Sequence, residues 1–331
     1  MALACCVPGS ESAICLLHKS RSLNDVSGAL REILGRQTIK LIFGICFNRR
    51  QGRTVTENNF HFIDVHNKNK NNYEKVIGIV GTTLNNINGA RQSIYVFGFG
   101  DGIEFLVNLI CASVICFSCV LLNLVVHIIF FLSALTNHTD LLKFITEPCN
   151  GVEEAISEYR RFAMAARSTE RVSYGPIIRK ATYMASQNRD QHHVLVIVAS
   201  EPVTRSFDTK HGKLSPDEED THKAIKDAKM FRLSIILVGI GETNASMKNG
   251  LGNSDCCSHN NFTFVDYTQI MKNTPVIGRD KETDFCLAVI ENLPGQIRQG
   301  IERPARANVT AAEVLPSIVY IPPLIDNLAQ Q

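Results

Sequence analysis

Two kinds of hydrophobic pattern alternate along this chain. The first is a short run of mostly apolar residues, rich in β-branched side chains, such as LIFGICF and HVLVIVA. Runs of this length and composition are typical of strands that are buried on both faces of a sheet. They predict strands at 40–47, 93–99, 193–199, 233–239 and 261–266.

The second pattern is an amphipathic run with apolar residues at helical spacing. Such runs predict helices at 73–86, 151–167, 176–187, 215–230 and 282–293. The run at 215–230 opens with Ser215, Pro216 and Asp217, which is a typical helix start with a cap, a proline and an early acid. Strands alternating with helices predict an α/β fold with a mostly parallel sheet covered by helices. In such sheets ligands bind at the carboxyl ends of the strands.

One stretch, 105–139, does not fit this alternation because it contains no Asp, Glu, Lys or Arg. Its length and apolarity would allow it to span a bilayer, but a single crossing would put the two halves of the sheet on opposite sides of the membrane. Three interpretations remain open: an apolar helix or hairpin packed against the domain, a true membrane span in a broken domain, or foreign sequence such as translated intron.

Composition narrows the class of protein. Apolar residues make up 45% of the chain and charged residues 20%, with a formal net charge of +2, so we expect a folded domain without nucleic-acid binding. The 11 cysteines are scattered, and the one CxxC, Cys116 to Cys119, lies within the apolar run without a second pair or a histidine at zinc-finger spacing. We therefore expect reduced thiols and an intracellular protein of the cytoplasm or nucleus.

The segment at 192–216 has the sequence HHVLVIVASEPVTRSFDTKHGKLSP. Further segments in the same register lie at 72–84, 95–101, 149–154, 233–241 and 261–271. Together these segments resemble the copine-type von Willebrand factor A domain of the plant RING-domain ubiquitin ligases, and the segment at 192–216 is the most specific of them. The resemblance implies a doubly wound, mostly parallel sheet with helices on both faces. It divides the chain into a leader with a short helix at 1–35, a domain at 36–300 interrupted by an apolar insertion at about 104–140, and a partly ordered tail at 301–331.

The resemblance also implies a divalent-cation site at the top of the sheet, the metal-ion-dependent adhesion site, built from carboxylates and hydroxyls. In this sequence its positions fall on Cys46, Asn48, Arg50, Val172 and Ser200. Two expected carboxylates are thereby lost and a permanent cation is added. We therefore expect a degenerate site that has lost the family's Mg²⁺ or Ca²⁺ and no resident cofactor.

Three further residues are possible residual ligands, namely Asp101, Glu201 and Ser173. No nucleophile and base are placed together on the predicted strand ends, so we assign no catalytic residue.

Residues 301–331 contain no cysteine or histidine, so a zinc-binding RING is not expected there. We expect a protein-interaction module related to the ubiquitin ligase pathway, with candidate partner-binding residues Arg49, Arg53, Thr204 and Arg205. One alternative is a ligase component that pairs with a RING-bearing partner or the conjugating machinery. Another is a membrane-anchored variant, held through 105–135, or a non-functional one.

Overall fold

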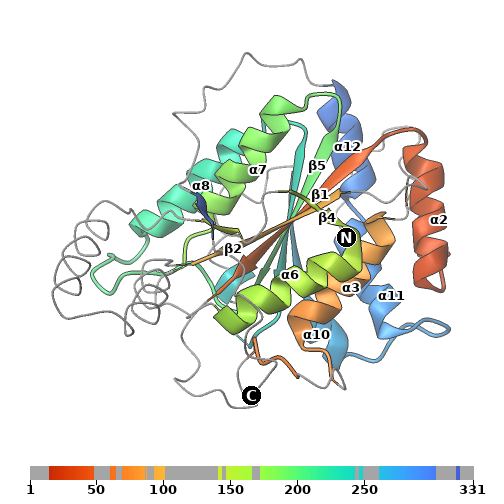
Figure 1. Cartoon of the computed structure of the whole chain (residues 1–331), viewed down its shortest axis with the longest axis horizontal. Helices are drawn as coiled ribbons and strands as arrows, with labels where there is room; N and C mark the ends of the chain where they lie inside the picture. Colours follow the sequence, from red (N-terminus) through yellow and green to blue (C-terminus); the bar gives the residue numbers. More distant parts are fainter. Residues whose placement is uncertain are drawn as a thin grey trace, which may run out of the picture.

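An eight-stranded sheet forms the centre of the protein (Figure 1). The computed structural model describes residues 15–47, 60–64, 69–85, 87, 93–100, 141–143, 147–165, 172–242, 246–248, 261–302 and 318–320. The strands are β1 (Ile39–Cys46), β2 (Ser93–Phe99), β3 (Leu141–Lys143), β4 (Cys149–Asn150), β5 (His192–Ala199), β6 (Leu233–Gly239), β7 (Phe262–Asp266) and β8 (Ile318–Tyr320). Their order is β7-β6-β5-β1-β2-β3-β8, with β4 also paired to β2.

The long strands are parallel, as the sequence pattern predicts. β1 lies between β2 and β5, and β6 and β7 continue the parallel pairing on the β5 side. The short strands β3 and β4 run antiparallel to β2, and β8 pairs parallel to β3. The predicted strands match β1, β2, β5, β6 and β7 to within one residue at either end, and β5 and β6 are buried along their whole length.

Helices cover both faces of this sheet, which confirms the predicted doubly wound α/β class. They are α2 (Leu23–Leu34), α3 (Asn72–Asn85), α6 (Val152–Ala165), α7 (Gly175–Gln187), α8 (Pro216–Ala228), α10 (Tyr267–Lys272), α11 (Lys281–Ile290) and α12 (Leu293–Glu302). Helices α7 and α8 lie side by side on one face, while α2, α3, α6, α11 and α12 cover the other (Figure 1).

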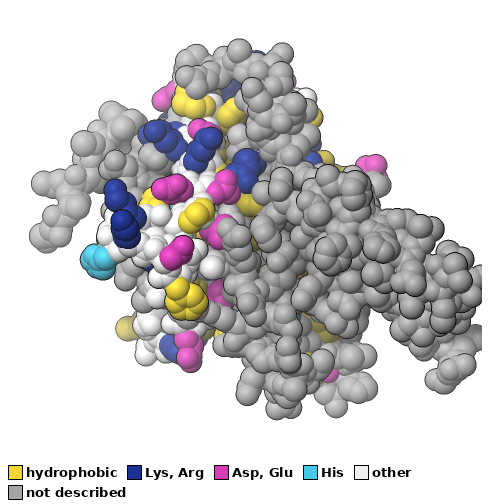
Figure 2. Space-filling view, turned by 90° about the vertical axis from the view of Figure 1, so that its left-hand side faces the viewer, with side chains coloured by type: hydrophobic (Ala, Val, Ile, Leu, Met, Phe, Trp, Pro, Cys, Tyr) yellow, Lys and Arg dark blue, Asp and Glu magenta, His cyan; other side chains and the backbone are white. Residues whose placement is uncertain are grey.

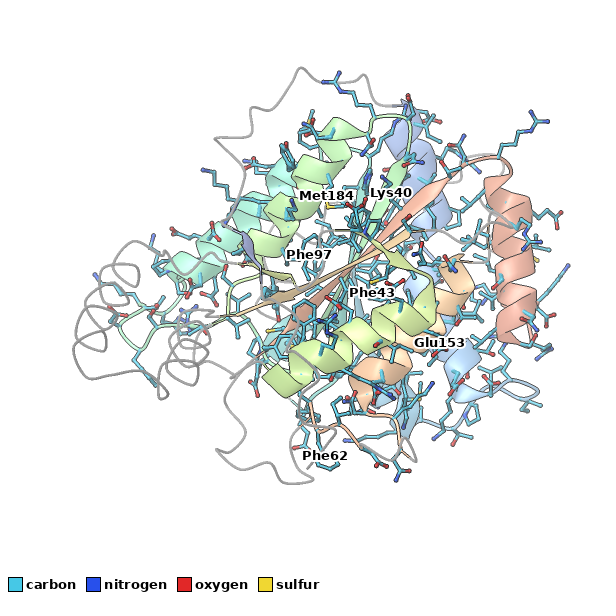
Figure 3. The ribbon with its side chains drawn as sticks, viewed as in Figure 1. Lys40, Phe43, Phe62, Phe97, Glu153 and Met184 are labelled. Carbon is cyan, nitrogen blue, oxygen red and sulfur yellow. The ribbon has the colours of Figure 1, made fainter. Side chains whose placement is uncertain are left out.

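Alternate residues of each strand supply the two resulting cores. On β1, Leu41, Phe43 and Ile45 pack toward α3 and α6, whereas Ile42 and Cys46 pack toward α7. Phe43 and Phe97 illustrate the split, since they come from neighbouring strands and belong to opposite cores (Figure 3). Side chains in a strand point alternately to the two faces, so a strand with both sets apolar must be covered on both sides.

A glycine allows α7 to lie close to the sheet. A Cβ atom added to Gly44 would come within 2.6 Å of Cγ1 of Ile177. Real Cβ contacts are longer than this, so the missing side chain at position 44 accommodates the Ile177 side chain.

The helix predicted at 282–293 is confirmed as α11 except for its last residues, and the sequence pattern did not predict α12, which follows it. Helix α11 ends at Ile290, and α12 begins at Leu293 with Pro294 in its first turn. Proline has no N–H to donate and is tolerated only where a helix starts, so it separates the two helices. The sequence pattern also missed α10, whose start is capped by the side chain of Asp266 accepting from the Gln269 N–H at 2.8 Å.

Helix α2, predicted as part of the leader, packs into the same core as the sheet. Val26 and Leu30 are fully buried, and the guanidinium of Arg31 donates to the Ile87 carbonyl at 3.0 Å. Its own start is a reciprocal capping box between Ser22 and Asp25. The helix is therefore part of the folded domain.

Candidate functional site

Strand β1 ends at a buried cysteine. The resemblance to the copine-type domain places the first metal ligand at this position. The Cys46 side chain is fully buried and belongs to the apolar cluster on the α7 face, together with Phe99, Val172 and Ala199. Burial raises the pKa of its thiol far above the ordinary value, and the nearby charge of Glu201 adds to the increase. The thiol is therefore neutral and a poor ligand for a hard cation.

The carbonyl oxygen of Cys46 accepts hydrogen bonds from side chains on the other face of the sheet. The hydroxyl of Tyr73, in the first turn of α3, donates to it at 3.2 Å, and Nε2 of His61 lies 3.1 Å away. Both side chains are buried. The main chain at the end of β1 is thus held by α3 and by the loop that contains His61.

The ring of His61 is stacked between two other rings. Its centroid lies 4.0 Å from that of Tyr73 and 4.5 Å from that of Phe47, with interplanar angles of 19° and 21°. Burial lowers the pKa of His61 to about 3, although its bond to the Cys46 carbonyl partly opposes this shift. A carbonyl can only accept, so Nε2 carries the proton and Nδ1 accepts from the Tyr159 hydroxyl at 3.2 Å.

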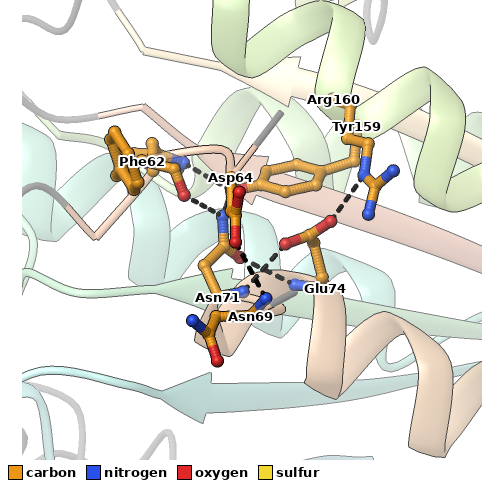
Figure 4. A network of polar contacts seen from close by, with 8 residues as sticks. Phe62, Asp64, Asn69, Asn71, Glu74, Tyr159 and Arg160 are labelled. Carbon is orange, nitrogen blue, oxygen red and sulfur yellow. Dashed lines mark hydrogen bonds and ion pairs between the residues drawn. The ribbon is translucent and has the colours of Figure 1, made fainter. Parts of the chain in front are cut away.

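A polar network next to this stack fixes the start of α3 (Figure 4). The Asn71 side chain accepts from the Glu74 N–H at 3.0 Å, and the Glu74 carboxylate accepts from the Asn71 N–H at 2.8 Å, forming a reciprocal cap. Nδ2 of Asn71 also donates to the Tyr159 hydroxyl and to the Phe62 carbonyl, each at 3.0 Å. Glu74, which is buried, forms a 2.6 Å ion pair with Arg160 of α6.

The second position of the predicted metal site is occupied by an alkyl side chain in the core. Val172 is 1% exposed, and its N–H donates to Oγ1 of Thr204 at 2.7 Å while its carbonyl accepts from the Thr204 N–H at 2.9 Å. The next residue, Ser173, donates from its hydroxyl to Asp220 of α8 at 3.2 Å and accepts from the Gly175 N–H at 3.2 Å. Its hydroxyl therefore links α7 and α8.

The third position lies just after β5. Ser200 and Glu201 are both 8% exposed, and Oγ of Ser200 lies 3.5 Å from the Tyr73 hydroxyl. The Glu201 carbonyl accepts from the hydroxyl of Tyr174 at 2.6 Å. On the β6 side, a Cβ atom added to Gly241 would collide with the Ser200 carbonyl oxygen. Tyrosine hydroxyls and close main-chain packing therefore enclose this end of the sheet.

Cys46 and Val172 belong to one apolar cluster, and the charge of Glu201 raises the pKa of the Cys46 thiol. No group of three His, Cys, Asp or Glu side chains is arranged to hold a metal in the part of the chain that the structure describes. The other predicted positions, Asn48, Arg50 and Asp101, lie outside the described residues.

Thr204 and Arg205, predicted to contact a partner, use their polar groups within the protein. Besides its bonds to Val172, Thr204 accepts at its carbonyl from Oγ of Ser215 at 2.9 Å. The guanidinium of Arg205 pairs with Glu218 at 2.9 Å, although the side chain remains 42% exposed. Arg49 and Arg53, the other two predicted contacts, are not among the described residues.

The apolar run at 105–139 also lies outside the described residues. Among the residues that are described, no helix combines the length and the apolarity needed to cross a membrane.

Sequence reasoning missed the residues that surround Cys46. His61 lies between segments without a clear periodicity, and Tyr174 stands just ahead of α7. The start of α3, and with it Tyr73, was predicted by the helix at 73–86, and Asn71 followed three residues later by Glu74 is a capping pattern that agrees with this start.

The chain is similar to several curated proteins. It is 33% identical over 286 residues to E3 ubiquitin-protein ligase RGLG1 of Arabidopsis thaliana, covering 85% of this chain and 51% of that protein. It is also 33% identical to RGLG4 of the same plant over 315 residues, covering 91% of this chain and 69% of that ligase. Copine family protein 2 of Caenorhabditis elegans is 29% identical over 283 residues, covering 84% of this chain and 3% of the nematode protein.

The matched region can be compared with the fold. Residues 133–307 match the copine family, and this range contains β5, β6 and β7 together with the helices that cover them. The chain spans only about half the length of RGLG1. With more than half of its residues in the family match and a relative such as RGLG4 covered over most of its length, the chain belongs to the copine family.

Proposed function

We propose that this chain is a copine-type protein-interaction module of the ubiquitin ligase pathway, and that it binds its partners without a metal ion. The observation that carries the proposal is the burial of Cys46 and Val172 in one apolar cluster at the end of the sheet. A cation there would need charged or hydroxyl oxygens from these two positions, and neither side chain supplies one.

Charge supports the same conclusion. Mg²⁺ requires near-octahedral oxygen ligands and keeps several waters, so a site with a neutral thiol and an alkyl group leaves too few ligands. The sequence also puts Arg50 in the segment that follows β1. At about 4 Å and an effective dielectric near 20, the repulsion between two like unit charges is about 4 kcal/mol, and the repulsion between a unit charge and a dication is larger.

The link to ubiquitin transfer rests on the relatives. RGLG1 and RGLG4 are named E3 ubiquitin-protein ligases, and this chain is similar to each of them at 33% identity. One alternative is therefore a ligase component that acts with a RING-bearing partner. The other alternative, a membrane-anchored or non-functional variant, rests on the apolar run at 105–139.

A peptide selection tests the proposal. The purified 331-residue chain would be immobilised and used to select from a phage library of random dodecapeptides, once in EDTA and once in MgCl₂. The proposal predicts that the same specific sequences are enriched in both buffers. Failure to enrich any sequence, or enrichment only with MgCl₂, would contradict it.

A ubiquitination reaction separates the proposal from the ligase alternative. The chain would be mixed with ubiquitin, an activating enzyme and a conjugating enzyme, with or without RGLG1. An interaction module produces no ubiquitin chains by itself. Robust chain formation in the absence of RGLG1 would reject the proposal, and binding of the chain to RGLG1 would favour the alternative of a ligase component.

A further inference from the structure

The loop between β5 and α8 is built from two consecutive turns. The first is closed by the N–H of Thr209 donating to the Ser206 carbonyl at 3.1 Å, and the second by the N–H of Lys213 donating to the Lys210 carbonyl at 3.1 Å. Gly212 has a φ of 75°, a left-handed conformation that glycine adopts without strain. Residues 205–214, called the turn loop below, therefore have a defined main-chain path.

Arg205 ties the second turn to the domain. One nitrogen of its guanidinium donates to the carbonyls of Lys210 at 3.1 Å and Lys213 at 2.8 Å, and another donates to Glu218 at 2.9 Å. Glu218 is itself fixed, because its carboxylate accepts from the Ser215 N–H at 2.7 Å in the capping box of α8. One arginine thus connects both ends of the turn to the start of a helix.

The other end of the turn loop is fixed to the core. Thr204 is paired through its main chain and its hydroxyl with Val172, whose side chain is buried in the apolar cluster. The Ser215 hydroxyl donates to the Thr204 carbonyl at 2.9 Å, which closes the base of the loop. A loop held at its base and within its second turn loses little conformational entropy when a partner binds.

Phe207 lies in the first turn and is wholly exposed, at 106% of its reference area. It makes no contribution to the core, and the hydrogen bonds that hold the loop use main-chain groups and other side chains. A large aromatic side chain held in solvent by a preorganised loop is the arrangement found at the centres of protein interfaces, where aromatic residues are enriched.

The charges around Phe207 indicate what it would meet. Lys210, His211 and Lys213 are exposed on the same loop, with Asp208 as its one exposed acid. Figure 2 shows that basic side chains and a histidine gather on this side of the molecule, among acidic ones. The turn loop therefore carries both an exposed apolar ring and exposed basic groups.

We propose that the turn loop is a docking surface for a protein partner, with Phe207 as its anchor in an apolar pocket whose rim carries carboxylates. This inference rests on the proposed function, namely that the chain binds proteins without a metal ion. The rim carboxylates would face Lys210 and Lys213. Opposite charges at such an interface speed the association of the two proteins and fix their relative orientation.

The same features fit an anionic membrane less well. Phe207 is the one aromatic residue of the turn loop, and Asp208 follows it directly. The first turn of α8 adds three further acids, Asp217, Glu218 and Glu219, of which Glu219 is exposed. The exposed carboxylates of Asp208 and Glu219 would repel acidic lipid headgroups, whereas a protein partner can avoid them by shape.

The test uses the peptides enriched by the 331-residue chain in EDTA. Their binding would be measured by fluorescence anisotropy with the wild-type chain, Phe207→Ala, Lys210→Glu with Lys213→Glu, and Ile277→Ala. Ile277 is the matched control, because it is 93% exposed on the turn between α10 and α11. Thermal unfolding should be unchanged in Phe207→Ala, since the ring is wholly exposed.

The proposal predicts enriched peptides that combine aliphatic residues with Asp or Glu. Phe207→Ala and the double lysine variant should each weaken binding about tenfold or more, and Ile277→Ala should not. Peptides that bind Phe207→Ala as tightly as the wild type would overturn the inference while leaving the proposed function intact. Failure to enrich any peptide would reject both. Phe207-dependent binding to vesicles of phosphatidylcholine with phosphatidylserine, without peptide binding, would replace the protein partner by a membrane.

Discussion

The hydroxyl of Tyr73 lies 3.2 Å from the carbonyl oxygen of Cys46 and joins α3 to the end of β1. Both residues are completely buried, and the same carbonyl also accepts from His61. The end of the strand is thus held by side chains from the face opposite to the one on which the Cys46 thiol is packed.

Replacing Tyr73 by phenylalanine should destabilise the fold by about 1 kcal/mol, the typical net contribution of one buried hydrogen bond. The loss is moderate because the Cys46 carbonyl keeps its bond from His61. Urea denaturation monitored by circular dichroism measures it. Tyr183→Phe, on the half-exposed part of α7, is the control and should change the unfolding free energy by much less. Equal effects of the two variants would argue against the Tyr73 bond.

The buried histidines should make the protein acid-sensitive. The pKa of His61 is lowered to about 3 and that of His193 to about 4, chiefly by burial. Between the ordinary value of about 6.5 and these values, the unfolded chain binds the proton and the folded chain does not, so stability falls as pH falls. Each histidine should contribute up to about 1.4 kcal/mol per pH unit within its window.

His61→Gln tests this dependence, because the amide can replace the Nε2 donor but does not titrate. The unfolding free energy of the variant, measured by urea denaturation from pH 7 to pH 4, should depend less steeply on pH than that of the wild type. His193→Gln should make a further reduction in the dependence of the unfolding free energy on pH. Parallel curves for wild type and both variants would show that neither histidine is held neutral by the fold.

Two glycine-to-alanine substitutions should change the free energy of unfolding in opposite directions. One lies where α7 packs closely on β1, and the other lies within α2. Gly44→Ala should destabilise by about 1 to 3 kcal/mol, because the new Cβ would meet Ile177 at 2.6 Å in a packed core. Gly28→Ala, within α2, meets nothing within 4 Å and should instead stabilise by about 0.5 to 1 kcal/mol through helix propensity.

Thermal unfolding of the two variants checks this contrast. The double variant Gly44→Ala with Ile177→Ala should recover part of the loss attributable to the collision, so the two substitutions should not be additive. Strict additivity would mean that Ile177 is not the group that Gly44 accommodates.

The sequence predicted the parallel strands well for a specific physical reason. A strand such as β5 is buried on both faces along its whole length, so its apolar run begins and ends with the strand. The boundary between α11 and α12 was less evident, because apolar spacing continues across it and only Pro294 marks the break. The short strands β3 and β8, each of three residues, carry too little pattern to be predicted.

The candidate site was only partly predictable. The resemblance placed Cys46 and Ser200 at the carboxyl ends of two strands, and in the structure Cys46 ends β1 while Ser200 follows β5, its parallel neighbour. The apolar cluster that joins Cys46 to Val172 depends on how the segment before α7 packs, and the His61 stack depends on long-range contacts between 61, 73 and 159. Such contacts leave no local periodicity.

Titration calorimetry with MgCl₂, MnCl₂ and CaCl₂ tests the central claim most directly. The control is a chain with the family's ligands restored at four of the five positions, carrying Cys46→Asp, Asn48→Thr, Arg50→Ser and Ser200→Asp together, since one carboxylate cannot offset the remaining losses. We predict no heat beyond dilution for the wild-type chain and a saturable transition for the restored chain. A saturable micromolar transition in the wild type that Glu201→Gln abolishes would contradict the account.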